Sequence, residues 1–247
     1  MLKVIDKIKY FYKKRSFDIS CFCKMRGLSK KYKMISLGKY CFPRVLLTAN
    51  KLKPKRKQGE KSCPFDLAFF YNFDEIIKLL DTKFSNFYDG LVQDEENKWV
   101  NKDINAYFVH EFGLTKEQVI EKYNKRIKNL YDYFAEKSVH KFCVMASFEE
   151  VFDYQLENLK STLEKYMDKN EFSIILINQF SEYNSYESEN IYVINQNHNC
   201  EKFNYINKDG IWAIELEKRR MKEANDIYSE ITEKLIEIVR SKLLNKK

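Results

Sequence analysis

The stretch that decides the fold is KFCVMASFEEVFDYQLENLKSTLEKYMDKNEFSIILI, residues 141–177. Its two ends, Lys141–Ser147 and Phe172–Ile177, are apolar runs of strand length without alternation, as is typical of strands buried on both faces. Between them, Glu149–Met167 is predicted to be a helix. A strand, a helix and a second strand in this order indicate a right-handed crossover between parallel strands.

The same pattern of apolar strands and helices continues outward from this unit. Further strands are predicted at Lys33–Gly38 (KMISLG), Ala106–His110, Ile191–Ile194 and Ile211–Ile214, and further helices from Pro43, over Phe73–Leu80, over Thr115–Phe134 and over about Glu217–Leu244. Residues 85–103 are polar and mixed, and a loop is predicted there. The fold class is therefore α/β, a three-layer sandwich with a mainly parallel sheet, an N-terminal basic helix and a long C-terminal helix.

Basic residues are concentrated at the N-terminus. Residues 1–33 hold eleven Lys and Arg residues against Asp6 and Asp18, whereas the whole chain of 247 residues has a formal charge of +8. The remainder is nearly neutral, so we expect no nucleic-acid partner, whose binding needs positive charge across a folded face. We divide the chain into a basic amphipathic segment, 1–32, and a single α/β domain, 33–247. Residues 1–15 have helical apolar periodicity and either contact an anionic membrane or pack on the body.

The N-terminus and the cysteines indicate a cytoplasmic protein. Charges at the N-terminus interrupt any apolar run long enough for a signal peptide, and no segment is long and apolar enough for a membrane span. The six Cys residues are then free thiols rather than a disulfide framework. Cys21 and Cys23 are too close for a C-x-x-C zinc motif, so we expect no metal and no cofactor. The abundance of Lys, Asn and Ile is typical of an AT-rich bacterial genome.

Cys41 is the first candidate for chemistry. It follows the predicted strand Lys33–Gly38 and precedes Pro43, which is favoured in the first turn of a helix. A helix N-terminus lowers the pKa of a thiol, and ligands of parallel sheets bind beyond the carboxyl ends of the strands. Gly38 lets a backbone N–H approach a substrate oxyanion. A buried structural cysteine is the alternative, because most free cysteines are buried.

A thiol nucleophile needs an imidazole as its base, and the chain offers three. His110 ends an apolar run and is the preferred candidate, whereas His140 and His198 are predicted to be peripheral. Asp66 either orients a histidine, binds substrate or caps the segment that follows it.

Ser36, Gly38, Arg44 and Arg126 are the candidate substrate-binding residues. The guanidinium of Arg126 suits a phosphate or a carboxylate, although a solvated helix face is the alternative. Glycine-rich nucleotide-binding motifs are absent from the sequence.

Four short motifs carry a resemblance to a known family. They are Ser36-Leu37-Gly38-Lys39-Tyr40-Cys41, Pro64-Phe65-Asp66-Leu67, His110-Glu111-Phe112 and Tyr123-Asn124-Lys125-Arg126. In this order they resemble a bacterial family of unknown function whose members are described as papain-like cysteine peptidases, over about residues 33–180. The resemblance implies that Cys41 is the nucleophile, His110 its general base and Asp66 a third polar group.

Two positions depart from that family pattern. Leu67 replaces a Trp and Glu111 replaces an Asp, which affects the shape of the pocket more than the Cys–His pair. A papain fold has its Cys on a long central helix against an antiparallel barrel. The order of strand, loop, Cys and helix in this sequence instead indicates a doubly wound hydrolase or transferase.

Three functions remain open at this point. The first is a Cys–His hydrolase or acyl transferase acting on the amide or ester of a small molecule, peptide or glycan. The second is a transferase of cell-surface polysaccharide assembly with a phosphorylated or lipid-linked donor, because the N-terminal segment and the loop Lys51–Lys61 are basic. The third is a non-enzymatic interaction module in which Cys41 is part of the core.

Overall fold

A computed structural model describes residues 2–54, 58–147, 149–179, 186, 188–195 and 218–244, with side chains described outside 2–11, 13–14 and 218–228. Its centre is a four-stranded sheet in the order β1 (Tyr32–Ser36), β6 (His140–Ser147), β7 (Phe172–Asn178) and β8 (Ile191–Asn195). All neighbouring strands are parallel, and Ser147 pairs with Asn178, which pairs with Asn195. The predicted parallel sheet is confirmed.

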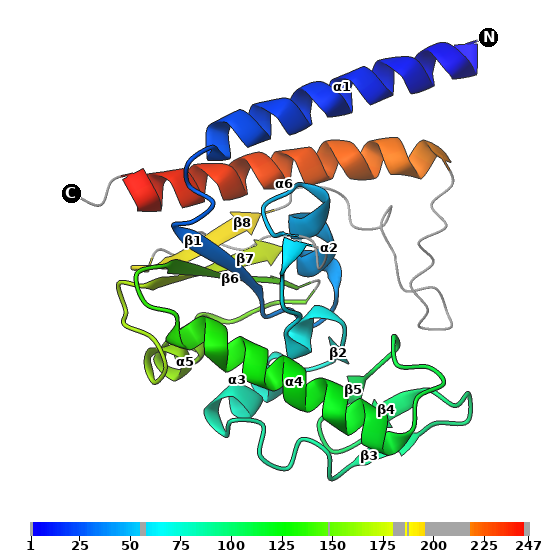
Figure 1. The fold of residues 1–247 in the computed structure, drawn as a ribbon, viewed down its shortest axis with the longest axis vertical. Coiled ribbons are helices and arrows are strands. Elements are labelled where there is room, and N and C mark those ends of the chain that lie inside the picture. Colours follow the sequence, from blue (N-terminus) through cyan, green and yellow to red (C-terminus); the bar gives the residue numbers. More distant parts are fainter. Residues whose placement is uncertain are drawn as a thin grey trace.

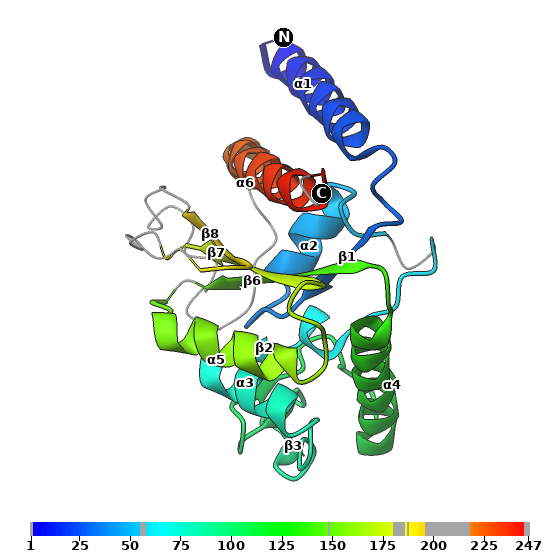
Figure 2. The same ribbon diagram turned by 90° about the vertical axis from the view of Figure 1, so that its left-hand side faces the viewer.

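Helices cover both faces of this sheet (Figures 1 and 2). On one face lie α3 (Phe73–Asp81), α4 (Lys116–Ala135) and α5 (Asp153–Glu164), and on the other lie α1 (Leu2–Met25), α2 (Phe42–Ala49) and α6 (Lys218–Leu244). Alternate residues of β6 enter the two core clusters, Cys143 with α3, α4 and α5 and Val144 with α1, α2 and α6. The three-layer α/β sandwich and both terminal helices are therefore confirmed.

The ends of the helices follow local chemistry. Thr115 and Gln118 form the predicted capping box at the start of α4, which satisfies two backbone N–H groups that a helix leaves unpaired. Helix α5 begins at Asp153, four residues later than predicted, and Gln155 caps the N–H of Phe152. Helix α1 continues to Met25, beyond the predicted residues 1–15. The predicted strand Ile211–Ile214 lies outside the described residues.

A second, antiparallel sheet has the order β2 (Phe69–Phe70), β5 (Ala106–Tyr107), β4 (Trp99–Asn101) and β3 (Leu91–Gln93). The loop predicted over residues 85–103 is thus wrong, since β3 and β4 form a hairpin there. Its turn has Asn97 at φ 60°, and Asp94 N donates to Lys98 O at 2.9 Å. The strands have three residues each, too few to show an alternating pattern, and burial of Trp99 and Val100 in the core stabilises them.

The last turns of α1 pack on the body. Cys21 and Met25 are buried against the α2 and α6 cluster, Arg240 donates to Lys24 O, and Asp18 pairs with Lys51 at 3.5 Å. No helix within the described part of the chain is both long and apolar enough to cross a membrane.

Candidate functional site

Cys41 lies at the start of α2, beyond the carboxyl end of β1. The chain continues the sheet for one residue past β1, because Leu37 N donates to Val144 O at 2.9 Å. It then turns at Gly38, and Cys41 becomes the N-cap of α2, with Pro in the first turn. The carbonyl of Cys41 accepts the first hydrogen bond of the helix, from Val45 N at 3.0 Å.

Gly38 is required by the packing of this turn. A Cβ atom at this position would lie 2.9 Å from Pro43 Cγ and 2.9 Å from the backbone oxygen of Tyr40. Both distances are shorter than real Cβ contacts, so a larger residue would push the turn away from the helix that follows. The glycine therefore holds the turn close to the first residues of α2.

The Cys41 thiol is half-buried and free. Burial raises its pKa, and a hydrogen bond from the backbone N–H of Cys41 opposes this shift. The net direction is opposite to the lowering that the helix N-terminus suggests from the sequence. A thiol with a raised pKa has little free thiolate near neutral pH, so its attack on a carbonyl requires a neighbouring base.

Backbone hydrogen bonds bring the His110 segment toward the Cys41 turn. Phe70 N, in β2, donates to Lys39 O at 2.6 Å, and Phe70 pairs with Ala106 in β5. Lys39 precedes Cys41 by two residues, and Ala106 precedes His110 by four. Since adjacent strands are about 5 Å apart, the backbones at Lys39 and Ala106 lie about 10 Å apart, on either side of β2.

His110 lies in a turn after β5, with an exposed side chain. The atoms around its ring still desolvate it, and this burial lowers its pKa; Glu111 opposes the shift, while Arg126 and Lys122 add to it. A lowered pKa keeps the imidazole neutral at pH 7. His110 is thus in the protonation state that a general base requires.

Glu111 joins the His110 turn to α4. Its buried carboxylate accepts from Arg126 Nη1 at 2.6 Å and from Lys122 Nζ. The Arg126 guanidinium also lies over the Tyr123 ring, 4.6 Å from its centroid. Arg126 is therefore buried and paired, and its guanidinium holds the segment that carries His110.

Asp66 belongs to a buried cluster of four charges. Its carboxylate accepts from Lys53 Nζ at 3.0 Å, from Arg44 Nη1, and from the Cys63 backbone N–H at 2.7 Å. Glu60 completes the cluster through Arg44 Nη2 at 3.0 Å and Lys53 Nζ at 3.1 Å. We name these four residues (Arg44, Lys53, Glu60 and Asp66) the charge cluster.

The charge cluster ties α2 to the segments around it. Burial opposes ionisation of Asp66, but the charges of Lys53 and Arg44 outweigh it and hold the pKa of this carboxyl below its usual range. Arg44 lies in α2, three residues after Cys41, and Asp66 ends the short 3-10 helix Pro64–Asp66. Arg44 and Asp66, predicted to bind substrate and to assist catalysis, are thus paired with each other in a buried network.

Ser36 is fully buried, and its hydroxyl oxygen has no hydrogen-bond partner among the described residues. Four further polar residues lie at the carboxyl edge of the sheet and were not selected from the sequence. Lys39 pairs with Glu149, and the Tyr40 hydroxyl donates to Gln179. Lys39 and Tyr40 lie within the Ser36–Cys41 motif, which is the signal that could have identified them.

The other histidines lie apart from this site or outside the described residues. His140 begins β6, is buried, and contacts Ser173 Oγ at 2.9 Å through Nε2. His198 lies outside the described residues. Within the part of the chain that the structure describes, no group of three or more His, Cys, Asp or Glu side chains could hold a metal ion.

Comparisons with known proteins complete this description. A family model described as "Putative papain-like cysteine peptidase (DUF1796)" matches residues 32–181. This range begins at the first residue of β1 and includes Cys41, Asp66, His110 and Arg126. No curated protein and no solved structure matches the chain.

Proposed function

Because the chain belongs to the family described as "Putative papain-like cysteine peptidase (DUF1796)", we propose that it is a Cys–His hydrolase or acyl transferase, with Cys41 as nucleophile and His110 as general base. The observation that carries the proposal is the hydrogen-bonded connection from Lys39 through Phe70 to Ala106. This connection joins the half-buried thiol at the head of α2 to the turn that bears a neutral imidazole.

The reaction follows from these two groups. Cys41 Sγ attacks the carbonyl carbon of an amide or ester, forming an S–C bond while the thiol proton passes to His110. Backbone N–H groups near Gly38 and Cys41 stabilise the oxyanion. His110 then gives its proton to the leaving amine or alcohol as the C–N or C–O bond breaks. Water resolves the thioester in a hydrolase, and a second nucleophile does so in a transferase.

Two pKa shifts support attack by a thiol that His110 deprotonates, in place of attack by a preformed thiolate. Burial raises the pKa of Cys41, and burial also lowers the pKa of His110. These shifts favour the neutral pair, thiol and imidazole, over the ion pair of thiolate and imidazolium. The rate of acylation should then rise with pH through the lowered pKa of His110.

The test is a pre-steady-state burst with p-nitrophenyl acetate, which acylates a reactive thiol and releases a coloured phenol. The unmodified chain should release one equivalent in the burst. Cys41→Ser should abolish the burst, and His110→Ala should slow acylation by about 10²- to 10⁴-fold, the usual contribution of a general base.

Cys23→Ser serves as the matched control, because Cys23 is an exposed thiol on α1. It should leave the burst unchanged. A burst that survives Cys41→Ser, or an acylation rate that His110→Ala does not alter, would refute the mechanism. Loss of the burst in Cys23→Ser would assign it to that surface thiol instead.

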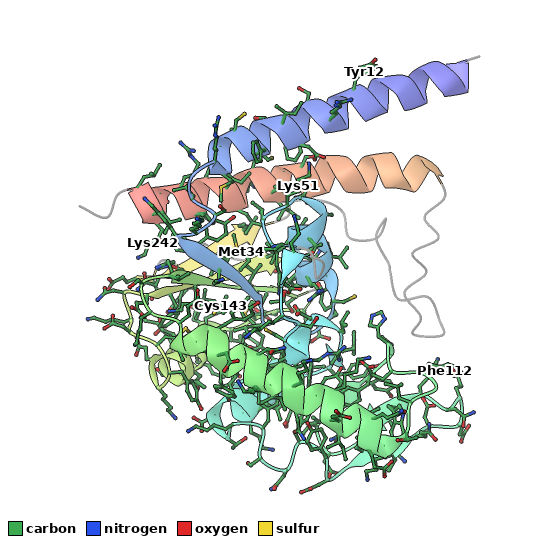
Figure 3. The ribbon with its side chains drawn as sticks, viewed as in Figure 1. Tyr12, Met34, Lys51, Phe112, Cys143 and Lys242 are labelled. Carbon is green, nitrogen blue, oxygen red and sulfur yellow. The ribbon has the colours of Figure 1, made fainter. Side chains whose placement is uncertain are left out.

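A second proposal concerns attachment to an anionic membrane through α1. Tyr12, Ile19 and Phe22 are 66%, 56% and 63% exposed, whereas Cys21 and Met25 on the packed side are 5% and 9% exposed. Tyr12 projects from α1 on the side away from α6 (Figure 3). Exposed apolar side chains on a helix of a strongly basic segment suit a surface of anionic lipids, because the lipids provide both apolar contact and opposite charge.

Flotation with phosphatidylglycerol vesicles tests this attachment. The full chain should float with the vesicles, and the triple variant Tyr12→Ser/Ile19→Ser/Phe22→Ser should stay in the bottom fraction of the gradient. Vesicles of phosphatidylcholine alone are the control and should bind neither protein well. Equal flotation of the two proteins would rule out this face of α1 as the membrane contact.

A further inference from the structure

A cavity lies apart from Cys41. It has a volume of about 760 Å³ and is lined by the end of α1, the start of β1, the end of α2, and residues 50–54 and 58–60. This volume is within the range of about 300–1,000 Å³ that small-molecule sites occupy.

The cavity and Cys41 lie at opposite ends of α2. Thr48 and Asn50, at the carboxyl end of this helix, line the cavity, whereas Cys41 caps its amino end. Eight helical residues span about 12 Å. In addition, Tyr32 and Lys33 of the cavity wall begin β1, and Cys41 follows the end of that strand. The two sites are therefore distinct.

One cation of the lining, Arg26, favours an anion. Of the other three, Lys53 is held by Glu60 and Asp66 in the charge cluster. Lys33 and Lys51 form surface ion pairs at 3.5 Å with Glu136 and Asp18, which lie outside the lining. Arg26 is exposed, and no ion pair joins it to any described acidic residue. A phosphate or carboxylate entering here meets the guanidinium of Arg26, and it competes only with exposed, weak ion pairs for Lys33 and Lys51.

Buried polar groups line the inner wall. The side chains of Lys53 and Glu60 are each only 2% exposed. Lys53 Nζ contacts Asp66 at 3.0 Å and Glu60 at 3.1 Å, which uses two of the three N–H donors of an ammonium. The buried Thr48 hydroxyl has no hydrogen-bond partner among the described residues. Buried donors of this kind are normally satisfied by protein or by a bound group.

The remaining wall is apolar. Met34 from β1, Met25 and Phe22 from α1, and Leu52 from the segment after α2 contribute to it. Methionine side chains adapt their shape to the molecule that they contact. The lining thus combines an apolar wall with a cationic rim.

We propose that this cavity binds an anionic amphiphile, a molecule with one phosphate or carboxylate group joined to an apolar body. The anionic group is held by Arg26, and the apolar body lies against Met25, Met34 and Leu52. This binding is independent of the Cys41 reaction, since none of the groups involved touches that thiol.

Isothermal titration of the full chain with octyl phosphate, below its micelle concentration, tests the proposal. We expect the unmodified chain to bind one equivalent, and we expect Arg26→Glu to bind octyl phosphate at least tenfold more weakly. Ser29→Trp, which places an indole at the lining, should remove binding. The matched controls are Lys102→Glu and Ser85→Trp, exposed positions outside the cavity, and should bind as the unmodified chain does.

A parallel titration with vesicles of phosphatidic acid distinguishes a free ligand from a lipid headgroup. If octyl phosphate binds and Ser29→Trp removes this binding, the ligand is a soluble molecule. If only the vesicles bind, and Ser29→Trp removes that binding, the ligand is a lipid headgroup. If Ser29→Trp and Ser85→Trp bind each probe equally well, the cavity is not the binding site. If the unmodified chain binds uncharged octyl glucoside as tightly as octyl phosphate, the site does not recognise an anion.

Discussion

Gly38 controls how closely the turn before Cys41 approaches α2. Its hydrogen atom occupies a space where a Cβ would lie 2.9 Å from Pro43 Cγ. Leu37 before it and Tyr40 two residues after it are buried, so the turn is held from both sides and has little room to move. A single methyl group at this position should therefore affect both stability and the thiol.

Gly38→Ala should reduce the free energy of unfolding by about 1–3 kcal/mol, the usual cost of overpacking. It should also slow the acylation of Cys41, because the turn that carries the thiol must move. Urea denaturation and the p-nitrophenyl acetate burst measure the two effects. Gly27→Ala is the control for the second effect, since a Cβ there meets no atom within 4 Å; unchanged acylation in Gly38→Ala would contradict this account.

Glu111 decides the electrostatic state of its neighbour His110. Its negative charge raises the pKa of the imidazole, against the larger lowering effect of burial. Removing this charge takes away stabilisation of the imidazolium and leaves the cationic Arg126 and Lys122 in place. The pKa of His110 must then fall further.

Glu111→Gln should therefore lower the pKa of His110, measured by NMR titration of its ring protons. It should also destabilise the fold by about 3–5 kcal/mol, because Arg126 is left buried without its anion. Glu117→Gln, on the exposed first turn of α4, is the control and should leave the His110 pKa unchanged. A rise in the His110 pKa in Glu111→Gln would show that the assigned sign is wrong.

At the scale of the elements, α6 is an integral layer of the sandwich. Ile231, Leu235, Ile236 and Val239 are buried, and they share a cluster with Phe142 and Val144 of the central strand β6. One helix thus covers much of a sheet face that would otherwise expose apolar side chains to water. The same helix supports the packed end of α1.

Leu235→Ala should destabilise the protein by about 2–5 kcal/mol, through lost burial and the cavity that remains. Leu244→Ala, at the exposed end of the same helix, should change stability by less than about 0.5 kcal/mol. Chemical denaturation of both variants provides the comparison. Similar stabilities for the two would mean that α6 is not part of the cooperative fold.

At the scale of the whole molecule, the charge cluster couples stability to pH. It joins α2, the segment after it and the Pro64–Asp66 helix, so its loss affects several parts of the fold. The pKa of Asp66 is lowered in the folded state. The stability that Asp66 contributes is therefore fully present above its unfolded pKa, near 4, and is lost as pH falls through its lowered folded value.

Asp66→Asn should destabilise the protein at pH 7 by about 3–5 kcal/mol, the usual cost of breaking a buried ion pair. The difference from the unmodified chain should shrink as the pH is lowered below about 4, because the wild-type carboxyl then loses its charge as well. Unfolding free energies from pH 7 to pH 2 test this. A difference that stays constant over the whole range would exclude the linkage.

Local patterns in the sequence were enough for the central sheet and its helices. The runs Lys141–Ser147 and Phe172–Ile177 hold five apolar residues each without alternation, as is typical of a strand covered on both faces. The capping box at Thr115 and the position of Pro43 are likewise local chemistry. In the second sheet, β5 falls within the predicted strand Ala106–His110. Strands β2, β3 and β4 escaped prediction because two or three residues show no period and their stability comes from distant partners.

The sequence by itself determined which residues could react and where the parallel strands run, since periodicity, caps and motifs depend on neighbours along the chain. Only the tertiary structure decided what surrounds each candidate. It paired Asp66 with Arg44 and Arg126 with Glu111, and it linked the His110 segment to the Cys41 turn through β2. Burial and charge act through space between segments far apart in the chain, so no local pattern records them.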